Sequence, residues 1–186
     1  MMKRFLAESL KELMLQKSFE KITIKQICDK TGVIRATFYN YFEDKYAALS
    51  YIIYLDTVET ALPYIEKRQF LQAVKAMLDN FVENREFYQI AFRITGQNSF
   101  EDLFEENVQQ LFTEMFRRYG RPEKLGTMSE EELAGYFGNS LCYTVNHWLC
   151  RSRGMDSEPF LKQYGSVVTS SIFDFLDMPQ GGGNGA

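Results

Sequence analysis

The chain has 186 residues, of which 45% are hydrophobic and 15% aromatic, with only four prolines. This composition predicts one or two small, well-packed domains and excludes an intrinsically disordered protein. No apolar run approaches the roughly 18 residues of a membrane span, and the N-terminus lacks a signal-peptide core, so we expect a cytoplasmic protein with no membrane partner. The three cysteines, Cys28, Cys142 and Cys150, are irregularly spaced and predict reduced thiols rather than a disulfide or zinc site.

The net charge of −4 is unevenly distributed along the chain. Residues 1–46 carry a net charge of +3, whereas the remaining residues carry −7. A basic N-terminal part on an acidic body directs attraction for phosphates to the N-terminal part. An excess of this size also arises by chance between segments, so the charge alone does not identify a nucleic-acid-binding protein.

The first predicted helix spans about residues 3–16 and is amphipathic. Its apolar residues at helical spacing form the side that we expect to be buried: Phe5, Leu6, Leu10, Leu13 and Met14. Phe19 and Ile22, in the short connection that follows, are expected to pin this helix to the next one. Lys3 and Arg4 at its tip suit phosphate contacts and ordinary surface positions equally well.

The stretch TIKQICDKTGVIRATFYNYF predicts two short helices joined by a tight turn. Thr23 and Gln26 have the spacing of a capping box, and Gly32 stands where a helix end needs a left-handed residue. In the second helix, Phe38 and Phe42 are four residues apart and can pack on the first. The pattern indicates a DNA-binding helix-turn-helix, although helical hairpins whose tyrosines only pack share it.

The outer face of the second helix, about residues 35–42, carries side chains suited to DNA. Arg35 can donate to guanine or to a phosphate, and Asn40 can pair with adenine. Hydroxyl groups suited to phosphate oxygens come from Thr37, Tyr39 and Tyr41. Lys45 and the amide end of the helix that begins at Thr23 offer further anion contacts.

The rest of the chain predicts only helices, so the expected fold class is all-α, with an N-terminal three-helix domain and a C-terminal helical bundle. The helix that follows Asp44, its predicted N-cap, is expected to end near Pro63. Asn84, Ser99 and Ser129 are the predicted N-caps of later helices. These helices cover about residues 44–63, 69–83, 85–94, 100–119, 130–153 and 157–176.

The segment FEKITIKQICDKTGVIRATFYNYFEDKYAAL resembles the N-terminal domain of TetR-family transcriptional regulators. The T-G-V turn, the T-F-Y-x-Y-F run and the acidic-Lys pair carry the resemblance. It implies a DNA-binding domain at residues 1–50, a regulatory and dimerisation domain at 51–178 and a flexible tail at 179–186. Carried over to this sequence, the family's DNA contacts fall on Thr23, Arg35, Ala36, Thr37, Tyr39, Asn40, Tyr41 and Lys45.

Ile34 departs from the family pattern, in which a Ser or Thr usually caps the second helix. Isoleucine cannot accept the N-cap hydrogen bond, at a typical cost of about 1 kcal/mol. Its side chain can instead contact a thymine methyl group, which places it among the candidate DNA contacts. The alternative is a co-regulator of the same fold that acts through a protein partner rather than by binding DNA directly.

The resemblance further implies a homodimer on a double-stranded DNA operator and a small-molecule effector that releases a repressor. The last two helices are expected to pair between protomers through residues that include Tyr136, Leu141, Val145, Trp148, Phe160, Tyr164, Val167 and Val168. Candidate ligand-binding residues are Tyr88, Phe92, Phe112, Met115, Tyr143 and His147, although aromatic stripes and lone histidines more often belong to a core. The segment from Phe87 to Phe100 resembles the subgroup of regulators near dihydroxyacetone kinase genes.

No residue pattern indicates catalysis. The chain has one histidine and lacks a Ser/His/Asp or Cys/His arrangement, a phosphate-binding glycine loop and a metal-ligand cluster. We therefore expect neither an enzyme nor a cofactor or metal site.

Overall fold

The computed structural model describes residues 1–120, 127–151 and 156–169, which form helices and no strands. This confirms the all-α prediction. No helix among these residues is long and apolar enough to cross a membrane. The elements are α1 (Met2–Met14), the 3-10 helix η1 (Phe19–Lys21), α2 (Ile24–Thr31), α3 (Arg35–Tyr39), α4 (Lys45–Tyr54), the π-helix η2 (Leu55–Glu59), α5 (Thr60–Ile65), α6 (Phe70–Glu83), α7 (Arg85–Ala91), α8 (Phe100–Tyr119), α10 (Glu130–Arg151) and α11 (Ser157–Thr169).

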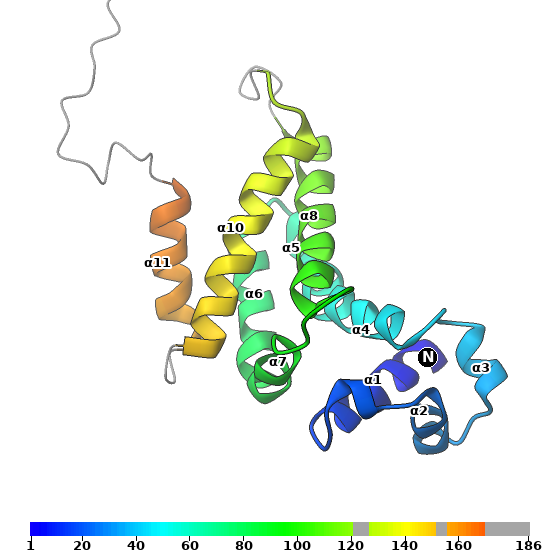
Figure 1. Cartoon of the computed structure of the whole chain (residues 1–186). Helices are drawn as coiled ribbons and strands as arrows, with labels where there is room; N and C mark the ends of the chain where they lie inside the picture. The colour runs from blue at the N-terminus through cyan, green and yellow to red at the C-terminus, as the bar shows by residue number, and fades with distance from the viewer. Residues whose placement is uncertain (121–126, 152–155, 170–186) are drawn as a thin grey trace, which may run out of the picture.

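Helices α1, α2 and α3 form a small head at one end of the molecule, and α4 leads from it into the helical body (Figure 1). The interior of the head is filled by side chains that are at most 2% exposed, among them Leu6, Leu10, Phe19, Ile22, Ile27 and Phe38. The expected burial of Phe5 is wrong, because its side chain is 57% exposed. Adjacent helical residues differ by about 100° around the axis, so Phe5 points away from the stripe that begins at Leu6.

A helical rod joins the head to the body, since α4, η2 and α5 follow one another without a break. Asp44 caps the rod as predicted, with its Oδ1 accepting a hydrogen bond from the Ala47 N–H at 2.8 Å. The rod continues through Pro63 and ends at Ile65, two residues later than the end near Pro63 that the sequence predicts. Pro63 therefore lies inside the continuous helix, two residues before its end, and removes one backbone donor there.

The body consists of α6, α7, α8, α10 and α11 (Figure 1). Two of its predicted N-caps are confirmed: the hydroxyl groups of Ser99 and Ser129 each accept a hydrogen bond at 3.1 Å from the N–H three residues later. Asn84 occupies the predicted N-cap position of α7, but its side chain makes no capping hydrogen bond. Its side-chain amide donates to the Asn80 carbonyl at 2.9 Å, because Asn84 closes α6 at the position where α7 begins.

Five of the residues expected to pair between protomers lie in the core of a single chain. Trp148 of α10 stacks on Phe160 of α11 with ring centres 4.4 Å apart. Leu141, Val145, Trp148, Phe160 and Tyr164 are all at most 6% exposed. Tyr136 and Val167 remain 67% and 56% exposed, respectively. The predicted residues of the final helix beyond 169, and the tail, lie outside the described residues.

Candidate nucleic-acid interface and ligand cavity

The turn between α2 and α3 has the geometry that the sequence predicts. Thr23 Oγ1 accepts from the Gln26 N–H at 3.3 Å, and Gln26 Oε1 accepts from the Thr23 N–H at 3.0 Å, which completes the capping box. Gly32 has a φ of 71°, a left-handed conformation that a residue with a Cβ adopts only at a cost. Phe38 and Phe42 are buried beneath the turn, so α3 is held with one fixed face outward.

The outward face of α3 carries most of the predicted DNA contacts. Ile34, Tyr39 and Tyr41 are 71%, 56% and 43% exposed. Arg35, Ala36 and Asn40 are also exposed, and Thr37 is half-buried. Within the part of the chain that the structure describes, the side chains of Arg35 and Asn40 make no hydrogen bond or ion pair with another residue. Ile34 occupies the N-cap position of α3 with no side-chain hydrogen bond, as the sequence requires.

Lys45, a predicted phosphate contact, uses its ammonium group inside the head. Its Nζ donates to the carbonyl oxygens of Phe19, Glu20 and Ile22 at 2.8, 3.1 and 3.2 Å. Partial burial lowers the pKa of this amine. Three acceptors match its three protons, so Lys45 holds η1 against the start of α4. A phosphate contact by Lys45 stays a prediction, and it requires one of these bonds to be exchanged.

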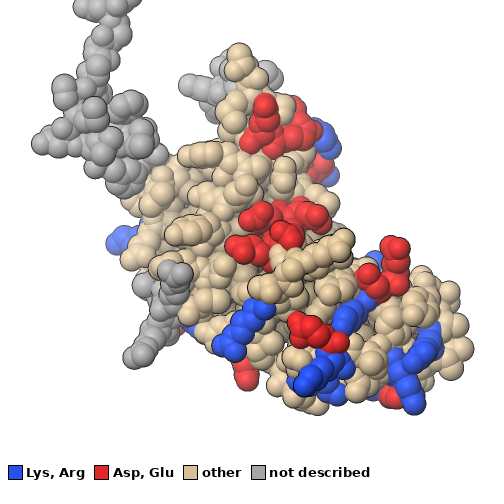
Figure 2. All heavy atoms as spheres, in the orientation of Figure 1, with Lys and Arg blue, Asp and Glu red and all other residues tan. Residues whose placement is uncertain are grey.

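The two cations at the tip of α1 also have partners within the chain. The Arg4 guanidinium pairs with Glu59 of η2. Lys3 Nζ lies 4.4 Å from the centre of the Tyr51 ring. Even so, the Lys and Arg side chains visible in Figure 2 lie mainly over the head, whereas acidic side chains dominate the visible middle of the body.

A buried polar cluster connects the head to the body. Lys11 of α1 donates to Asp56 Oδ2 of η2 at 3.0 Å, and the hydroxyl group of Tyr88 in α7 donates to the same oxygen at 2.8 Å. Burial, reinforced by the carboxylate of Asp56, raises the pKa of Tyr88 well above its ordinary value. Because the cluster draws one group from each of three elements, it fixes the head against α7 through the π-helical turn.

The π-helical turn itself is stabilised by side chains that satisfy its carbonyl groups. Thr57 Oγ1 donates to the Ile53 carbonyl at 2.6 Å, and Thr60 Oγ1 donates to the Leu55 carbonyl at 3.0 Å. Asn80 of α6 in turn donates to Thr60 Oγ1 at 2.8 Å. Such π-helical insertions are frequent at functional sites. Here the insertion places Asp56 between the head and the body.

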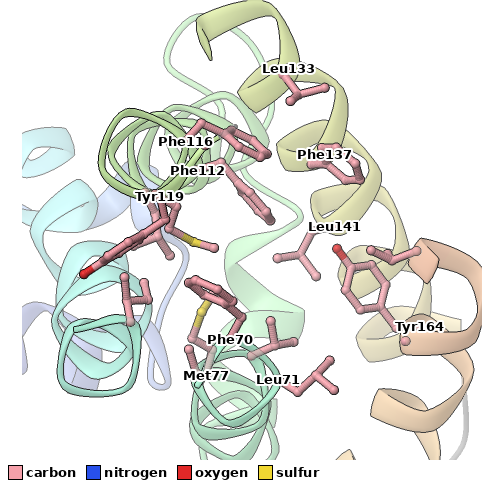
Figure 3. A pocket seen from close by; sticks show the side chains of 18 residues that line it. Phe70, Leu71, Met77, Phe112, Phe116, Tyr119, Leu133, Phe137, Leu141 and Tyr164 are labelled. Carbon is pink, nitrogen blue, oxygen red and sulfur yellow. The ribbon is translucent and has the colours of Figure 1, made fainter. Parts of the chain in front are cut away.

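An apolar cavity of about 410 Å³, partly open to solvent, lies between α5, α6, α8, α10 and α11. Figure 3 shows aromatic and aliphatic side chains from these helices pointing into a common space. The described residues that line it include no Asp, Glu, Lys, Arg or His: Ile65, Phe70, Leu71, Ala73, Val74, Met77, Leu111, Phe112, Met115, Phe116, Tyr119, Gly120, Leu133, Phe137, Leu141, Tyr164, Gly165 and Val168.

Two of the six predicted ligand-binding residues, Phe112 and Met115, line this cavity. Tyr88 lies in the polar cluster beside Asp56, and Phe92 packs on the Phe100 ring with centres 4.9 Å apart. Tyr143 is 71% exposed, and its ring is 6.4 Å from that of the exposed His147. These four residues therefore lie away from the cavity.

Sequence reasoning missed most of the cavity lining. The lining residues of α6 and α10, such as Val74 and Phe137, occur at helical spacing and had a detectable signal as an apolar stripe. A stripe does not show whether it faces another helix or an open space, and that depends on how the helices diverge. No three His, Cys, Asp or Glu side chains of the described residues cluster as a metal site requires.

Comparison with known protein families agrees with the two-part architecture. Residues 8–51 match the family described as bacterial regulatory proteins, tetR family. Residues 68–170, more than half of the chain, match the family described as transcriptional regulator C-terminal region. The first match spans the helix-turn-helix, and the second spans the helices around the cavity.

A curated relative is the HTH-type dhaKLM operon transcriptional activator DhaS of Lactococcus lactis, 29% identical over 101 residues. That alignment covers 54% of this chain and only about half of the relative, 53%. The solved structure of a dihydroxyacetone kinase operon activator DhaS has a TM-score of 0.65 at 22% identity, covering 89% of this chain and 93% of that one.

Two further solved structures share the fold at lower identity. A putative TetR-family regulator from Syntrophomonas wolfei has a TM-score of 0.65 at 16% identity, with 89% and 91% of the two chains covered. Thermus thermophilus FadR, a repressor solved with lauroyl-CoA, has a TM-score of 0.59 at 14% identity, with 99% and 100% covered. With both halves of the chain matched, the protein belongs to the TetR family of DNA-binding transcriptional regulators and is not an enzyme.

Proposed function

We propose that this protein is a homodimeric repressor that binds an operator through α3 and releases it when a small molecule occupies the cavity. The observation that carries the proposal is the outward face of α3, where Arg35 and Asn40 are exposed and have no partner among the described residues. Arginine and asparagine are the side chains best suited to guanine and adenine in the major groove.

The rod formed by α4, η2 and α5 supports coupling between the cavity and the head. Ile65 at its end lines the cavity, while Asp56 in its middle holds Lys11 of the head. An occupant that moves α5 relative to α6 therefore acts on the same helix that positions α1. The proposed head, residues 1–50, and the proposed regulatory part, residues 51–178, share this one helix, so the two cannot move independently.

A DNA-binding assay with the upstream region of the protein's own gene tests the proposal. We expect specific binding that weakens as salt rises, because Lys and Arg release counterions from the phosphates they contact. Arg35→Ala should weaken specific binding by about 1–3 kcal/mol if Arg35 contacts a base. Arg93→Ala, an exposed arginine of the body, is the matched control and should leave affinity unchanged. A folded protein without specific binding to that DNA argues against the proposal.

A reporter gene placed behind the same upstream region tests the direction of regulation. Deletion of the regulator gene should raise reporter expression if the protein is a repressor. A fall in expression would instead make it an activator, the role named for DhaS.

Ile34 favours a second candidate function, that of a co-regulator acting through a protein partner. Its side chain is 71% exposed at the start of α3, where it offers an apolar contact in place of a helix cap. Recovery of the same metabolic-enzyme partner by wild-type protein but not by Ile34→Ser, together with no specific DNA binding, would select this candidate. Specific DNA binding by the isolated protein would select the first.

A further inference from the structure

We infer that the cavity binds an uncharged, apolar molecule that carries one hydrogen-bond acceptor, and that the hydroxyl group of Tyr164 recognises this acceptor. The inference rests on the proposed function, since it names the chemical class of the effector. Three properties of the cavity carry it: its size, the absence of charge in its lining and the position of one hydroxyl group.

The cavity is too large to be a packing defect. Protein interiors contain few voids larger than a water molecule, whereas small-molecule sites span roughly 300–1,000 Å³. The cavity volume of about 410 Å³ falls within that range. Its walls come from five helices, so the space is built by the arrangement of the body rather than by one misfitting side chain.

The lining excludes an ionised ligand group from the interior. Among the lining residues that the structure describes, none carries a charge that could pair with such a group. An unpaired charge is strongly disfavoured when it moves from water into apolar surroundings, so a ligand without charge suits this part of the pocket best. Aromatic rings such as those of Phe112 and Phe137, 6.2 Å apart, instead favour flat or aliphatic carbon groups.

Two of the lining residues, Tyr119 and Tyr164, carry a hydroxyl group, and the two hydroxyl groups point in different directions. In Figure 3 the hydroxyl oxygen of Tyr164 points from α11 toward Leu141, across the cavity, whereas that of Tyr119 points away from it. The Tyr119 ring is held from outside by Arg68, 5.2 Å from its centre, and packs against Phe70. Only the first hydroxyl group is therefore placed to meet a ligand.

Tyr164 is only 6% exposed, and its hydroxyl group has no hydrogen-bond partner among the described residues. Because no fully buried side-chain oxygen of the described residues lacks a partner, this oxygen keeps accessible surface and can donate to a molecule in the pocket. Burial raises the pKa of Tyr164 to about 12, which keeps the hydroxyl group protonated and able to donate. The complementary ligand group is a carbonyl, ether or similar uncharged acceptor.

Three compounds with one skeleton test the inference on the full-length protein. Benzophenone has two rings joined by a carbonyl group, diphenylmethane replaces that carbonyl with a methylene group, and 4-benzoylbenzoate adds a carboxylate to benzophenone. Affinities are measured by displacement of the neutral fluorophore N-phenyl-1-naphthylamine. The key quantity is the ratio of the benzophenone affinity to the diphenylmethane affinity, because it cancels effects common to both compounds.

In Tyr164→Phe we expect this ratio to fall by about threefold to tenfold, the size of one net hydrogen bond. Tyr119→Phe is the matched control and should leave the ratio unchanged. In the wild-type protein, 4-benzoylbenzoate should bind more than about tenfold more weakly than benzophenone. Irradiated benzophenone, which attaches to nearby C–H groups, should label peptides that contain Met77 or Met115.

An unchanged ratio in Tyr164→Phe, or an equal fall in Tyr119→Phe, would overturn the role of Tyr164. Tight binding of the carboxylate, or labelling confined to other peptides, would overturn the uncharged class or the site. These outcomes are independent of DNA binding. A protein that binds the probes as expected but no DNA would refute the proposed function alone, and one that binds DNA but no probe would refute this inference alone.

Discussion

The ammonium nitrogen of Lys11 lies 3.0 Å from Oδ2 of Asp56, and this buried pair ties the DNA-binding head to the body of the protein. Their side chains are only 10% and 16% exposed. A second pair, Arg4 with Glu59, joins the same two elements but is 56% and 42% exposed. Both ion pairs join α1 to η2 and differ mainly in exposure. Comparing how much each pair contributes to stability therefore measures the effect of burial.

Asp56→Asn is expected to destabilise the protein by roughly 3 kcal/mol, because it leaves the Lys11 ammonium buried without a countercharge. Urea denaturation followed by circular dichroism measures the change. Arg4→Met is the control and should cost no more than about 1 kcal/mol, since solvent already screens that pair. Losses of equal size in the two variants would show that burial at Lys11 does not strengthen the pair.

Gly32→Ala should destabilise the head by roughly 1–2 kcal/mol. A Cβ at this position meets no atom within 4 Å, so the cost comes from the left-handed φ of 71° rather than from a clash. Thermal denaturation checks the prediction. Gly32→Asn should recover part of the loss, because asparagine tolerates this conformation better than alanine does. An alanine variant as stable as the wild type would contradict the assigned turn.

Ile34→Ser should stabilise the head by about 1 kcal/mol, because serine supplies the missing N-cap acceptor at the start of α3. Ile34→Ala, which removes the exposed side chain without adding a cap, separates capping from loss of the isoleucine. Melting temperature and operator affinity are measured on both variants. If the serine variant is no more stable than the alanine variant, the missing N-cap hydrogen bond does not reduce the stability of α3.

Tyr143→Glu should shift the protein from dimer to monomer in analytical ultracentrifugation. Tyr143 is 71% exposed on α10, on the face that the chain's own core leaves uncovered. A carboxylate at the centre of a protein–protein interface would be buried without a partner. Tyr39→Glu introduces the same charge on the exposed face of α3 and should leave the dimer intact. A wild-type monomer at all concentrations would refute the proposed assembly.

Local signals in the sequence predicted the head well. The capping box at Thr23, the left-handed Gly32 and the buried Phe38 depend on residues within a few positions of one another, so spacing alone locates them. The errors arose where a neighbouring element intervenes. Asn84 makes no side-chain capping bond because α6 runs up to it. The sequence also did not indicate that Lys45 donates to carbonyl groups more than 20 residues earlier, although its phosphate contact stays a prediction.

In the body, too, the sequence predicted the local features but not the contacts between distant segments. Periodicity identified helical stripes that include Phe112 and Leu141, and the family resemblance assigned several buried residues of α10 and α11 to a protomer interface. Whether an apolar stripe meets a second helix, a second chain or an empty space depends on the angles between helices. Those angles result from the packing of all the elements together.

The sequence by itself determined the all-α class, the helix-turn-helix and its outward side chains, because each follows from contacts between residues close in the chain. Only the tertiary structure decided that Lys11, Asp56 and Tyr88 meet, and that α6, α8, α10 and α11 separate enough to leave a cavity beside Tyr164. Those features join residues from distant segments, and hydrophobic burial drives the segments together without specifying in the local sequence which side chains will touch.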